Sequence, residues 1–281
     1  MKKRIMLLLL SLMAVFAVSV RAEEPINFDT PICVTINGHY IQMDSEPFLY
    51  NGTTYVPIRF ISEGLGADSV KWDAARNTAV IRQDGKTIEL PANKNAGYIN
   101  GKYVKINNGV KLVNDRTYVP VRFVSEHLGS QVGWNEQTYT VAISKNGITV
   151  PSHLKGYRGY TDDEIYWLSK IIHAESRGEP MRGKIGVGNV ILNRVKSSSF
   201  PNTIYTVIFD REHGVQFSPV LDGSIYQTPL GDSVIAAKRA LRGERPVGAS
   251  LYFMNPKTAA NSWIAQNRPY YTTIANHNFY L

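Results

Sequence analysis

An internal repeat constrains the fold of this chain more than any other feature of its sequence. The segment at residues 54–60, Thr-Tyr-Val-Pro-Ile-Arg-Phe, recurs at 117–123 with a single change. An Ile-Asn-Gly triplet precedes each copy, and a Leu-Gly pair followed by a tryptophan comes after each copy. Two copies at a nearly fixed spacing predict one shared α+β core for residues from about 30 to 150.

Each repeat predicts the same order of elements. The Ile-Asn-Gly triplet supplies a turn, a strand leads to Tyr-Val-Pro, and a short helix then ends at the glycine of Leu-Gly. A final hairpin carries the tryptophan, Trp72 or Trp134, and a β-branched run. Arg59 and Arg122 begin the two helices, and we expect each to hold the fold through a salt bridge. The single cysteine, Cys33, is expected to be a small buried apolar residue.

This repeat region resembles the stalk domain, also called the copper amine oxidase N-terminal-like domain. The resemblance covers about residues 29–146 and rests on Tyr-Val-Pro-x-Arg-Phe, Leu-Gly and the tryptophan. It implies a spacer or wall-binding module outside the membrane, and we assign the domain to residues 29–150. Copper is not expected, because this region of the sequence has no cluster of histidines, and His39 and His127 do not occupy equivalent repeat positions.

Residues 1–22 predict a secretory signal peptide. A basic start precedes an apolar run at 5–20, which is short for a membrane span of ~20 residues, and Val-Arg-Ala at 20–22 suits a signal peptidase. The alternative is an uncleaved anchor; we expect a secreted protein with no stable membrane anchor. The four basic residues of this leader carry half of the formal charge of +8. The remainder is mildly basic, which suits an anionic wall and is too weak to indicate nucleic acid.

Residues 158–281 predict a second domain, mainly helical with a small sheet. A Thr-x-x-Glu capping box at 161–164 begins a helix with apolar residues at helical spacing, and Glu175 lies in its last turn. A partly buried carboxylate at the negative end of a helix has a raised pKa, as a general acid needs at neutral pH. The alternative, which spacing alone favours, is a surface glutamate paired with Arg177 or Arg182.

The remaining pattern of this domain places further elements along the chain. We expect helices at 181–196, 203–209 and 232–241, a loop region at 216–223, and strands at 251–256 and 270–274. Gly186 and Gly188 would allow the second helix to pack closely against its neighbours.

The segment closely resembles the SleB/CwlJ-type cell wall hydrolases, the spore-cortex-lytic family. Matching motifs stand in order across the domain, at residues 174–180, 186–195, 200–203, 207–209, 216–217, 222–223, 252–256, 262–263 and 274–280. The resemblance implies a compact, lysozyme-like fold that acts on peptidoglycan glycan strands, in a vegetative wall or in the spore cortex during germination. The family's glutamate falls on Glu175. One departure is Ala275, where the family often has glycine, which would alter a turn.

The resemblance further implies a lytic transglycosylase with one catalytic carboxyl. Ordinary glycosidases use two carboxylates. Here Glu175 would protonate the glycosidic oxygen and then accept the proton of the muramic acid C6 hydroxyl, which attacks C1 and leaves a 1,6-anhydro end. No cofactor and no metal are required. Plain hydrolysis is an alternative, with Asp222 or Glu179 as the helper.

Peptidoglycan is the expected partner, and the matched motifs supply candidates for holding it. The substrate-binding candidates are Gln216, Phe217, Ser218, Tyr252, Asn255, Ser262, Trp263 and His277. Aromatic side chains are expected to stack on sugar faces, and Phe253, Tyr270 and Tyr271 join them in this role. The amides and hydroxyls are expected to bond N-acetyl or hydroxyl groups.

Two other functions stay open. A zinc-dependent N-acetylmuramoyl-L-alanine amidase could use His173, His213 and His277 as ligands. However, His173 and Glu175 point some 200° apart on a helix, because each residue turns ~100°. A non-catalytic wall-binding protein would bind peptidoglycan without cleaving it, and the intact motif around Glu175 disfavours this function.

Overall fold

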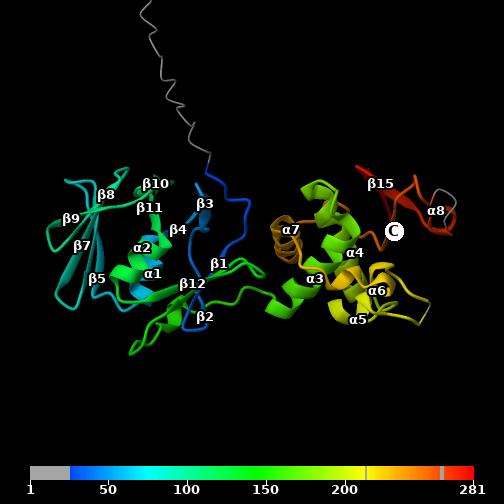
Figure 1. The fold of residues 1–281 in the computed structure, drawn as a ribbon, viewed down its shortest axis with the longest axis horizontal. Coiled ribbons are helices and arrows are strands. Elements are labelled where there is room, and N and C mark those ends of the chain that lie inside the picture. The colour runs from blue at the N-terminus through cyan, green and yellow to red at the C-terminus, as the bar shows by residue number, and fades with distance from the viewer. Residues whose placement is uncertain (1–25, 213, 260–262) are drawn as a thin grey trace, which may run out of the picture.

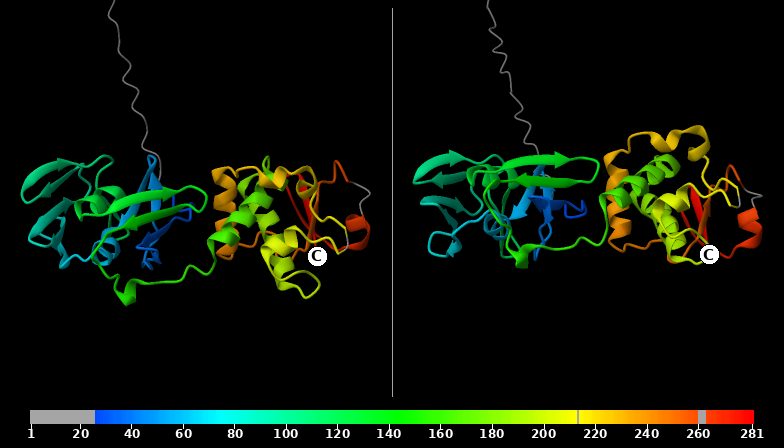
Figure 2. Two further views of the ribbon diagram at one scale, coloured as in Figure 1. Left: turned by 60° about the horizontal axis from the view of Figure 1, so that its bottom comes forward. Right: turned by 90° about the horizontal axis from the view of Figure 1, so that it is seen from below.

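The chain forms two lobes joined by one connection (Figures 1 and 2). The computed structural model describes residues 26–212, 214–259 and 263–281, so the predicted signal peptide lies outside the described residues. The first lobe is built of sheets with two short helices, and the second is mainly helical with one small sheet, which confirms the predicted fold class. None of the described helices is long and apolar enough to cross a membrane.

The two repeats of the first lobe give matching elements. The first repeat contributes β1 (Cys33–Ile36), β2 (His39–Tyr40), β3 (Phe48–Tyr50), β4 (Thr53–Pro57), α1 (Ile58–Gly64), β5 (Ser69–Asp73) and β6 (Thr78–Gln83). After β7 (Lys86–Pro91), the second contributes β8 (Ala96–Ile99), β9 (Lys102–Lys105), β10 (Lys111–Val113), β11 (Arg116–Pro120), α2 (Val121–His127), β12 (Gln131–Asn135) and β13 (Thr140–Ser144). Both helices end at the predicted Leu-Gly pairs, where Gly66 and Gly129 adopt φ of 82° and 78°.

An approximate twofold axis relates the two repeats. In the central sheet, ordered β10-β11-β4-β3, strands β4 and β11 pair antiparallel, and Val56 lies opposite its repeat equivalent Val119. Strand β1 of the first repeat joins β12 and β13 of the second, while β8 and β9 of the second extend the sheet of β5, β6 and β7. Each repeat therefore completes a sheet of the other, and the two fold as one unit.

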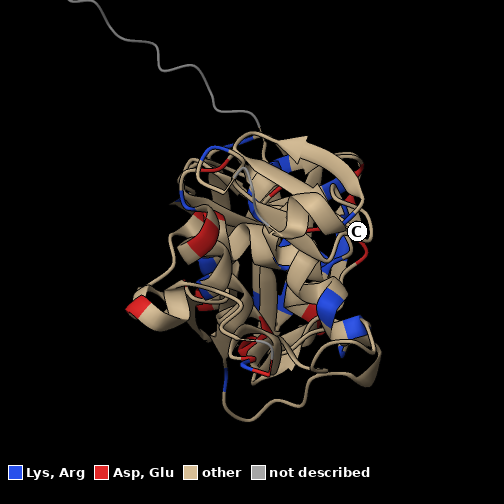
Figure 3. Cartoon of the chain, turned by 90° about the vertical axis from the view of Figure 1, so that its right-hand side faces the viewer, with Lys and Arg blue, Asp and Glu red and all other residues tan. Residues whose placement is uncertain are grey.

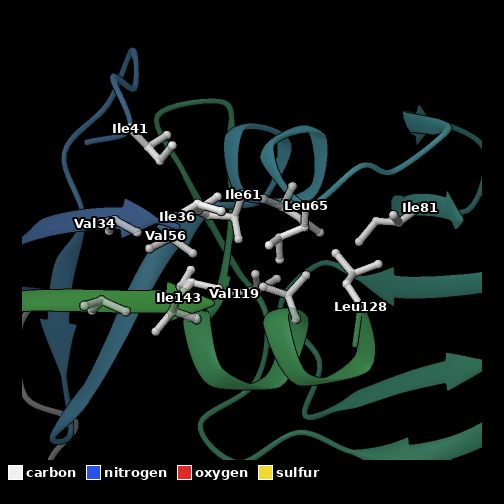
Figure 4. Close-up of a cluster of buried hydrophobic side chains, with 14 of the residues drawn as sticks. Val34, Ile36, Ile41, Val56, Ile61, Leu65, Ile81, Val119, Leu128 and Ile143 are labelled. Carbon is white, nitrogen blue, oxygen red and sulfur yellow. The ribbon is translucent and has the colours of Figure 1, made fainter. Parts of the chain in front are cut away.

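The core of this lobe draws on both repeats, as predicted. Ile61 of α1 is buried between the helices and the strands, together with Leu65 and Leu128, which follow the last residues of α1 and α2 (Figure 4). Cys33 is buried in β1, which confirms its predicted structural place.

The predicted salt bridges of the two helix-starting arginines do not hold this fold. Arg59 is exposed and, within the described residues, forms no ion pair or hydrogen bond. Arg122 contacts Glu126 at 3.3 Å, but both side chains are more than half exposed, so the pair contributes little stability. The prediction is therefore wrong for Arg59. Tight packing of the neighbouring apolar residues holds the helices instead.

The connection between the lobes is not a free spacer. It includes a single 3₁₀ turn, η1 (Ser152–Leu154), whose Leu154 is buried in the core of the first lobe. The Gln42 amide donates to the Leu154 carbonyl at 2.9 Å, and the Gly156 amide donates to the Tyr40 carbonyl at 3.0 Å. The segment at 151–156 is thus fastened to the repeat domain.

The second lobe follows the predicted order of elements. It contains α3 (Asp162–Ser176), α4 (Met181–Lys196), α5 (Ile204–Ile208), α6 (Pro219–Asp222), η2 (Ser224–Tyr226), α7 (Gly231–Leu241), β14 (Tyr252–Met254), α8 (Trp263–Asn267), β15 (Tyr270–Ile274) and β16 (His277–Tyr280). The predicted capping box of α3 is present: the Glu164 amide donates to the Thr161 hydroxyl at 3.1 Å, and the Glu164 carboxylate accepts from the Thr161 amide at 2.7 Å. Helices α6 and α8 and strand β16 were not predicted, because four or five residues are too few to show a period.

Helix α4 approaches its neighbours closely at two glycines, with Gly188 against α3 and α7 and Gly186 against Val247 and β16. A Cβ atom at Gly188 would lie 2.9 Å from Ile172, and one at Gly186 would lie 2.9 Å from both Phe279 and Val247. The close approach predicted from these residues is therefore confirmed.

We expect Gly186→Ala to destabilise the second lobe by about 1–3 kcal/mol, because the buried Phe279 ring and Val247 cannot move away without disturbing the core. Chemical denaturation measures this change. Gly178→Ala is the matched control, since a Cβ there meets no atom within 4 Å. An equal effect of the two substitutions would contradict the packing argument.

The two lobes meet through α7. The buried Lys238 ammonium donates to the carbonyls of Thr138 and Tyr139 at 2.7 and 2.9 Å, and Arg242 pairs with Glu46 at 2.8 Å. Burial lowers the pKa of Lys238 to about 8. Polar contacts therefore fix the end of the repeat domain against the helical lobe. Seen from the helical end, acidic and basic residues are interspersed (Figure 3).

Candidate active site

A pocket of about 770 Å³ opens in the helical lobe, and Glu175 lies in its wall. Its lining comes from α3, α4, the segment around α6, β14 and α8. The lining residues are Glu175, Arg194, Ser199, Phe200, Asp210, Gln216, Phe217, Ser218, Tyr252, Phe253, Trp263, Ile264 and Arg268. The pocket therefore joins segments that lie almost a hundred residues apart in the sequence.

Glu175 is the acidic group of the pocket that has no partner. It lies in the last turn of α3, one turn after the buried Ile171 and Ile172. Within the described residues its partly buried carboxyl forms no hydrogen bond or ion pair. Arg177 hydrogen-bonds Gln227 instead, and Arg182 is exposed, so the surface ion pair considered from the sequence is absent.

Burial raises the pKa of Glu175 to about 7, with the like charge of Asp222 as the second cause. Asp222 itself keeps a lowered pKa, because the Ser224 side chain and amide hydrogen-bond its carboxylate. At neutral pH Glu175 is therefore divided between its protonated and ionised forms, while Asp222 is ionised. The direction of this pKa shift was predicted from the sequence, because Glu175 was expected to be partly buried in the last turn of a helix. The contribution of Asp222 to the shift was not predicted.

Arg194 is the main feature of the pocket that sequence reasoning missed. It is 5% exposed, and its guanidinium lies 4.8, 5.3 and 5.4 Å from the ring centres of Phe200, Phe217 and Tyr252. Its Nε donates to the Leu251 carbonyl at 2.8 Å. Burial lowers its pKa to about 10, which leaves it charged at neutral pH.

The charge of Arg194 has no carboxylate partner within the described part of the chain. A buried charge without a counterion is costly to maintain. A signal for it was present: Arg194 follows Val187, Val190 and Ile191 at helical spacing, so it continues the apolar stripe of α4. An arginine on a core-facing stripe indicates a buried cation.

A second arginine borders the same pocket. The Arg268 guanidinium lies 4.6 Å from the Tyr252 ring centre and 5.0 Å from that of Trp263. Its Nε is buried without a hydrogen-bond partner in the described structure. The pocket thus presents aromatic faces together with two cations, an arrangement that suits a sugar bearing a carboxylate.

The structure gathers most of the predicted substrate-binding residues and leaves others outside. Gln216, Phe217, Ser218, Tyr252, Phe253 and Trp263 line the pocket. Asn255 instead holds a turn, since its Oδ1 accepts from the Lys257 amide at 3.0 Å. His277 is buried against Phe253, and Tyr270 and Tyr271 lie on β15 away from the lining. Ser262 lies outside the described residues.

Glu179 has a structural place and does not line the pocket. Its carboxylate accepts from the Asn276 amide at 3.2 Å and from the Asn276 side chain at 2.9 Å. These bonds hold the turn between β15 and β16, in which Ala275 adopts a left-handed φ of 49°. Glycine accommodates that conformation more easily, so these contacts steady the turn. Of the two helpers considered for hydrolysis, Asp222 alone remains near Glu175.

The histidines considered as metal ligands have separate surroundings. His173 accepts from the Leu230 amide at 3.3 Å beside Ser233, whereas His277 packs on aromatic rings of the small sheet. His213 lies outside the described residues. Within the described ranges, no group of three or more His, Cys, Asp or Glu side chains is placed to hold a metal ion.

An aromatic pocket whose carboxyl has no partner among the described residues is typical of acid–base chemistry on sugars. The sequence model of the copper amine oxidase N-terminal domain matches residues 35–143, and that of the Cell Wall Hydrolase family matches residues 178–280. The second match begins three residues after Glu175 and does not include it. Any role for Glu175 is therefore argued from its place in the pocket.

Individual relatives each match about two fifths of this chain. The spore cortex-lytic enzyme of Bacillus cereus is 43% identical over 121 residues, which are 43% of this chain and 45% of that enzyme. The cell wall hydrolase CwlJ of Oceanobacillus iheyensis is 32% identical over 114 residues, which are 38% of this chain and 79% of CwlJ. The catalytic domain of the germination-specific lytic transglycosylase SleB from Bacillus anthracis is 40% identical, with 45% of this chain and all of that domain covered and a TM-score of 0.41.

The chain therefore belongs to the cell wall hydrolase family. It spans less than half the length of the first spore cortex-lytic enzymes that it matches.

Proposed function

We propose that this chain is a peptidoglycan-cleaving enzyme that acts outside the cytoplasm as a lytic transglycosylase. The observation that carries the proposal is the state of Glu175: partly buried, without a partner among the described residues, and with a pKa raised to about 7. Such a carboxyl can give a proton and take one back at neutral pH. The names of the relatives, spore cortex-lytic enzyme and cell wall hydrolase, support a wall substrate.

The proposed reaction needs no water and no second base. Glu175 donates its proton to the oxygen that links C1 of muramic acid to the next sugar, and that bond breaks. The C6 hydroxyl of the same muramic acid attacks C1, and its proton passes to the Glu175 carboxylate. A 1,6-anhydro end and a free 4-hydroxyl result, and Glu175 regains its starting protonation.

Other groups in and beside the pocket have roles that follow from their charge. Positive charge develops at C1 as the bond breaks, and the ionised Asp222, which lies outside the pocket lining but whose charge acts on Glu175, stabilises it electrostatically. Arg194 and Arg268 bind the carboxylate of the muramic acid side chain or its peptide, while Trp263 and Tyr252 stack on sugar rings.

Mass spectrometry of the released fragments tests the proposal. The full chain is incubated with purified spore cortex and with vegetative peptidoglycan, beside Glu175→Gln. We expect anhydro-muramic ends from the parent chain and none from the variant. Reducing ends would instead establish hydrolysis, with Asp222 as the base that activates water. Free stem peptides from a still-active variant would overturn the role of Glu175 and favour an amidase.

Asp222→Asn is expected to move the alkaline limb of the activity profile to lower pH. Removing the like charge lowers the pKa of Glu175, so its protonated form is lost earlier as pH rises. The shift should be a fraction of a pH unit, because burial is the larger cause of the raised pKa. Initial rates from pH 5 to 9 measure it. An unchanged limb would show that Asp222 does not act on Glu175.

A further inference from the structure

Two hollows outside the active site lie at equivalent places in the repeat domain. They measure about 490 and 610 Å³. The first lies at the start of α1 and β5, and the second at the start of α2 and β12. The approximate twofold axis of the domain relates them, because their walls come from the same repeat positions.

Each hollow has an aromatic wall and a cation. Arg59, Phe60 and Trp72 line the first, and Arg122, Phe123 and Trp134 line the second. The opposite wall comes from the partner repeat, through Leu112 and Thr117 in the first hollow and through Leu49 and Thr54 in the second. The two hollows are therefore lined by the same kinds of side chain.

The tryptophans of the hollows are not used by the core. Trp72 is 43% exposed and Trp134 is 42% exposed, although the residues opposite them on the paired strands, Ala79 and Val141, are buried. The arginines are also exposed: Arg59 has no partner among the described residues, and Arg122 forms an exposed pair with Glu126 and donates to the Val132 carbonyl at 3.1 Å, which leaves most of its donors free for a ligand. A fold that needed these side chains for stability would bury or pair them.

We propose that the two hollows are a pair of glycan-binding subsites for peptidoglycan strands. Each indole face stacks on a sugar ring, and each guanidinium binds a carboxylate or carbonyl of the muramic acid substituents. This inference rests on the proposed function, which makes the peptidoglycan strand the polymer that the attached lobe cleaves. A repeating glycan also suits a repeated site, because two weak sites on one polymer reinforce each other.

The position of the second hollow supports this occupant. Tyr139 lines the hollow and packs on Trp134 with ring centres 5.2 Å apart. The Tyr139 carbonyl also accepts a hydrogen bond from Lys238 of α7. The Tyr139 hydroxyl lies so close to Gly231 that a side chain at that position would not fit. A strand held in this hollow is therefore held beside the helical lobe that carries Glu175.

Co-sedimentation of the full chain with insoluble peptidoglycan tests the proposal, with Glu175→Gln present throughout so that the wall stays intact. In that background, Trp72→Ala and Trp134→Ala should each weaken binding about tenfold, and the double variant should weaken it about thirtyfold or more. Trp→Tyr at both positions should restore most of the binding, because tyrosine still stacks. Tyr103→Ala is the matched control, as Tyr103 is 63% exposed on β9 and lines neither hollow.

Cleavage assays separate this proposal from the proposed function. With Glu175 intact, the tryptophan variants should cut short soluble glycan fragments at the parent rate and insoluble peptidoglycan more slowly. Binding to the wall that is unchanged in the double variant would overturn the two subsites, whatever the cleavage products are. A loss of cleavage of soluble fragments equal to that of insoluble wall would overturn them as well.

Discussion

Glu175→Gln is expected to lower the rate of peptidoglycan cleavage by about a thousandfold or more, and to stabilise the folded chain at alkaline pH. The rate falls because glutamine cannot donate a proton to the glycosidic oxygen. The stability rises because the same burial that raises the pKa of Glu175 to about 7 opposes its ionisation in the folded state. One substitution should therefore move activity and stability in opposite directions.

The pH dependence follows from the sign of the Glu175 shift. The folded protein holds this proton up to about pH 7, whereas an unfolded chain releases it near the ordinary value of 4.5. The free energy of unfolding therefore falls as pH rises from about 4.5 to 7, by roughly 2–3 kcal/mol. The variant lacks this loss, so it should gain that stability at pH 8 and almost none at pH 4.5.

Thermal unfolding at the two pH values measures the gain. We expect the melting temperature of Glu175→Gln to exceed that of the parent by several degrees at pH 8 and to equal it at pH 4.5. Glu136→Gln, an exposed glutamate of the repeat domain, is the control and should change neither stability nor rate. A variant that is inactive yet no more stable at pH 8 would show that Glu175 ionises freely in the folded protein.

Local and repeated features of the fold were readable from the sequence. The capping box at Thr161 and Glu164 concerns one turn of chain, and the end of α1 at Gly66 depends on one backbone conformation. The repeat gave the element order of the first lobe twice. The exchange of strands between repeats was not predicted, because the pairing of β1 with β13 joins residues more than a hundred positions apart.

The lining of the candidate pocket was predictable where a motif carried it. Glu175 and the stretch Gln216–Ser218 were found from short segments, and the pocket brings them together. The raising of the Glu175 pKa by Asp222 depends on how α6 packs near the end of α3, which no local pattern encodes. Asn255 and His277 belong to the matched motifs, yet the first holds a turn and the second packs on the small sheet. A motif thus marks residues that the domain needs. Only their packing in the structure distinguishes the residues that line the pocket from the residues that support it.

Arg194→Met is expected to lower kcat/KM for peptidoglycan by about a hundredfold, with most of the change in KM. Its guanidinium is buried under three aromatic rings and has no carboxylate partner in the described structure. Such a cation has a desolvation cost that an anionic group of the substrate can offset on binding. Arg194→Lys should recover little, because one ammonium cannot hold the Leu251 carbonyl and a substrate carboxylate in the geometry of a guanidinium.

The stability of Arg194→Met distinguishes this role from a structural one. Methionine has a similar length and removes the desolvated charge, so the variant should be as stable as the parent or slightly more stable. Arg182→Met on the same helix is the control, since Arg182 is exposed and lies outside the pocket. Steady-state kinetics and denaturation are measured together on the three chains. A variant that loses several kcal/mol of stability but cleaves normally when folded would make Arg194 a brace between α4 and β14. A stable variant with a raised KM would place the anionic part of the substrate beside it.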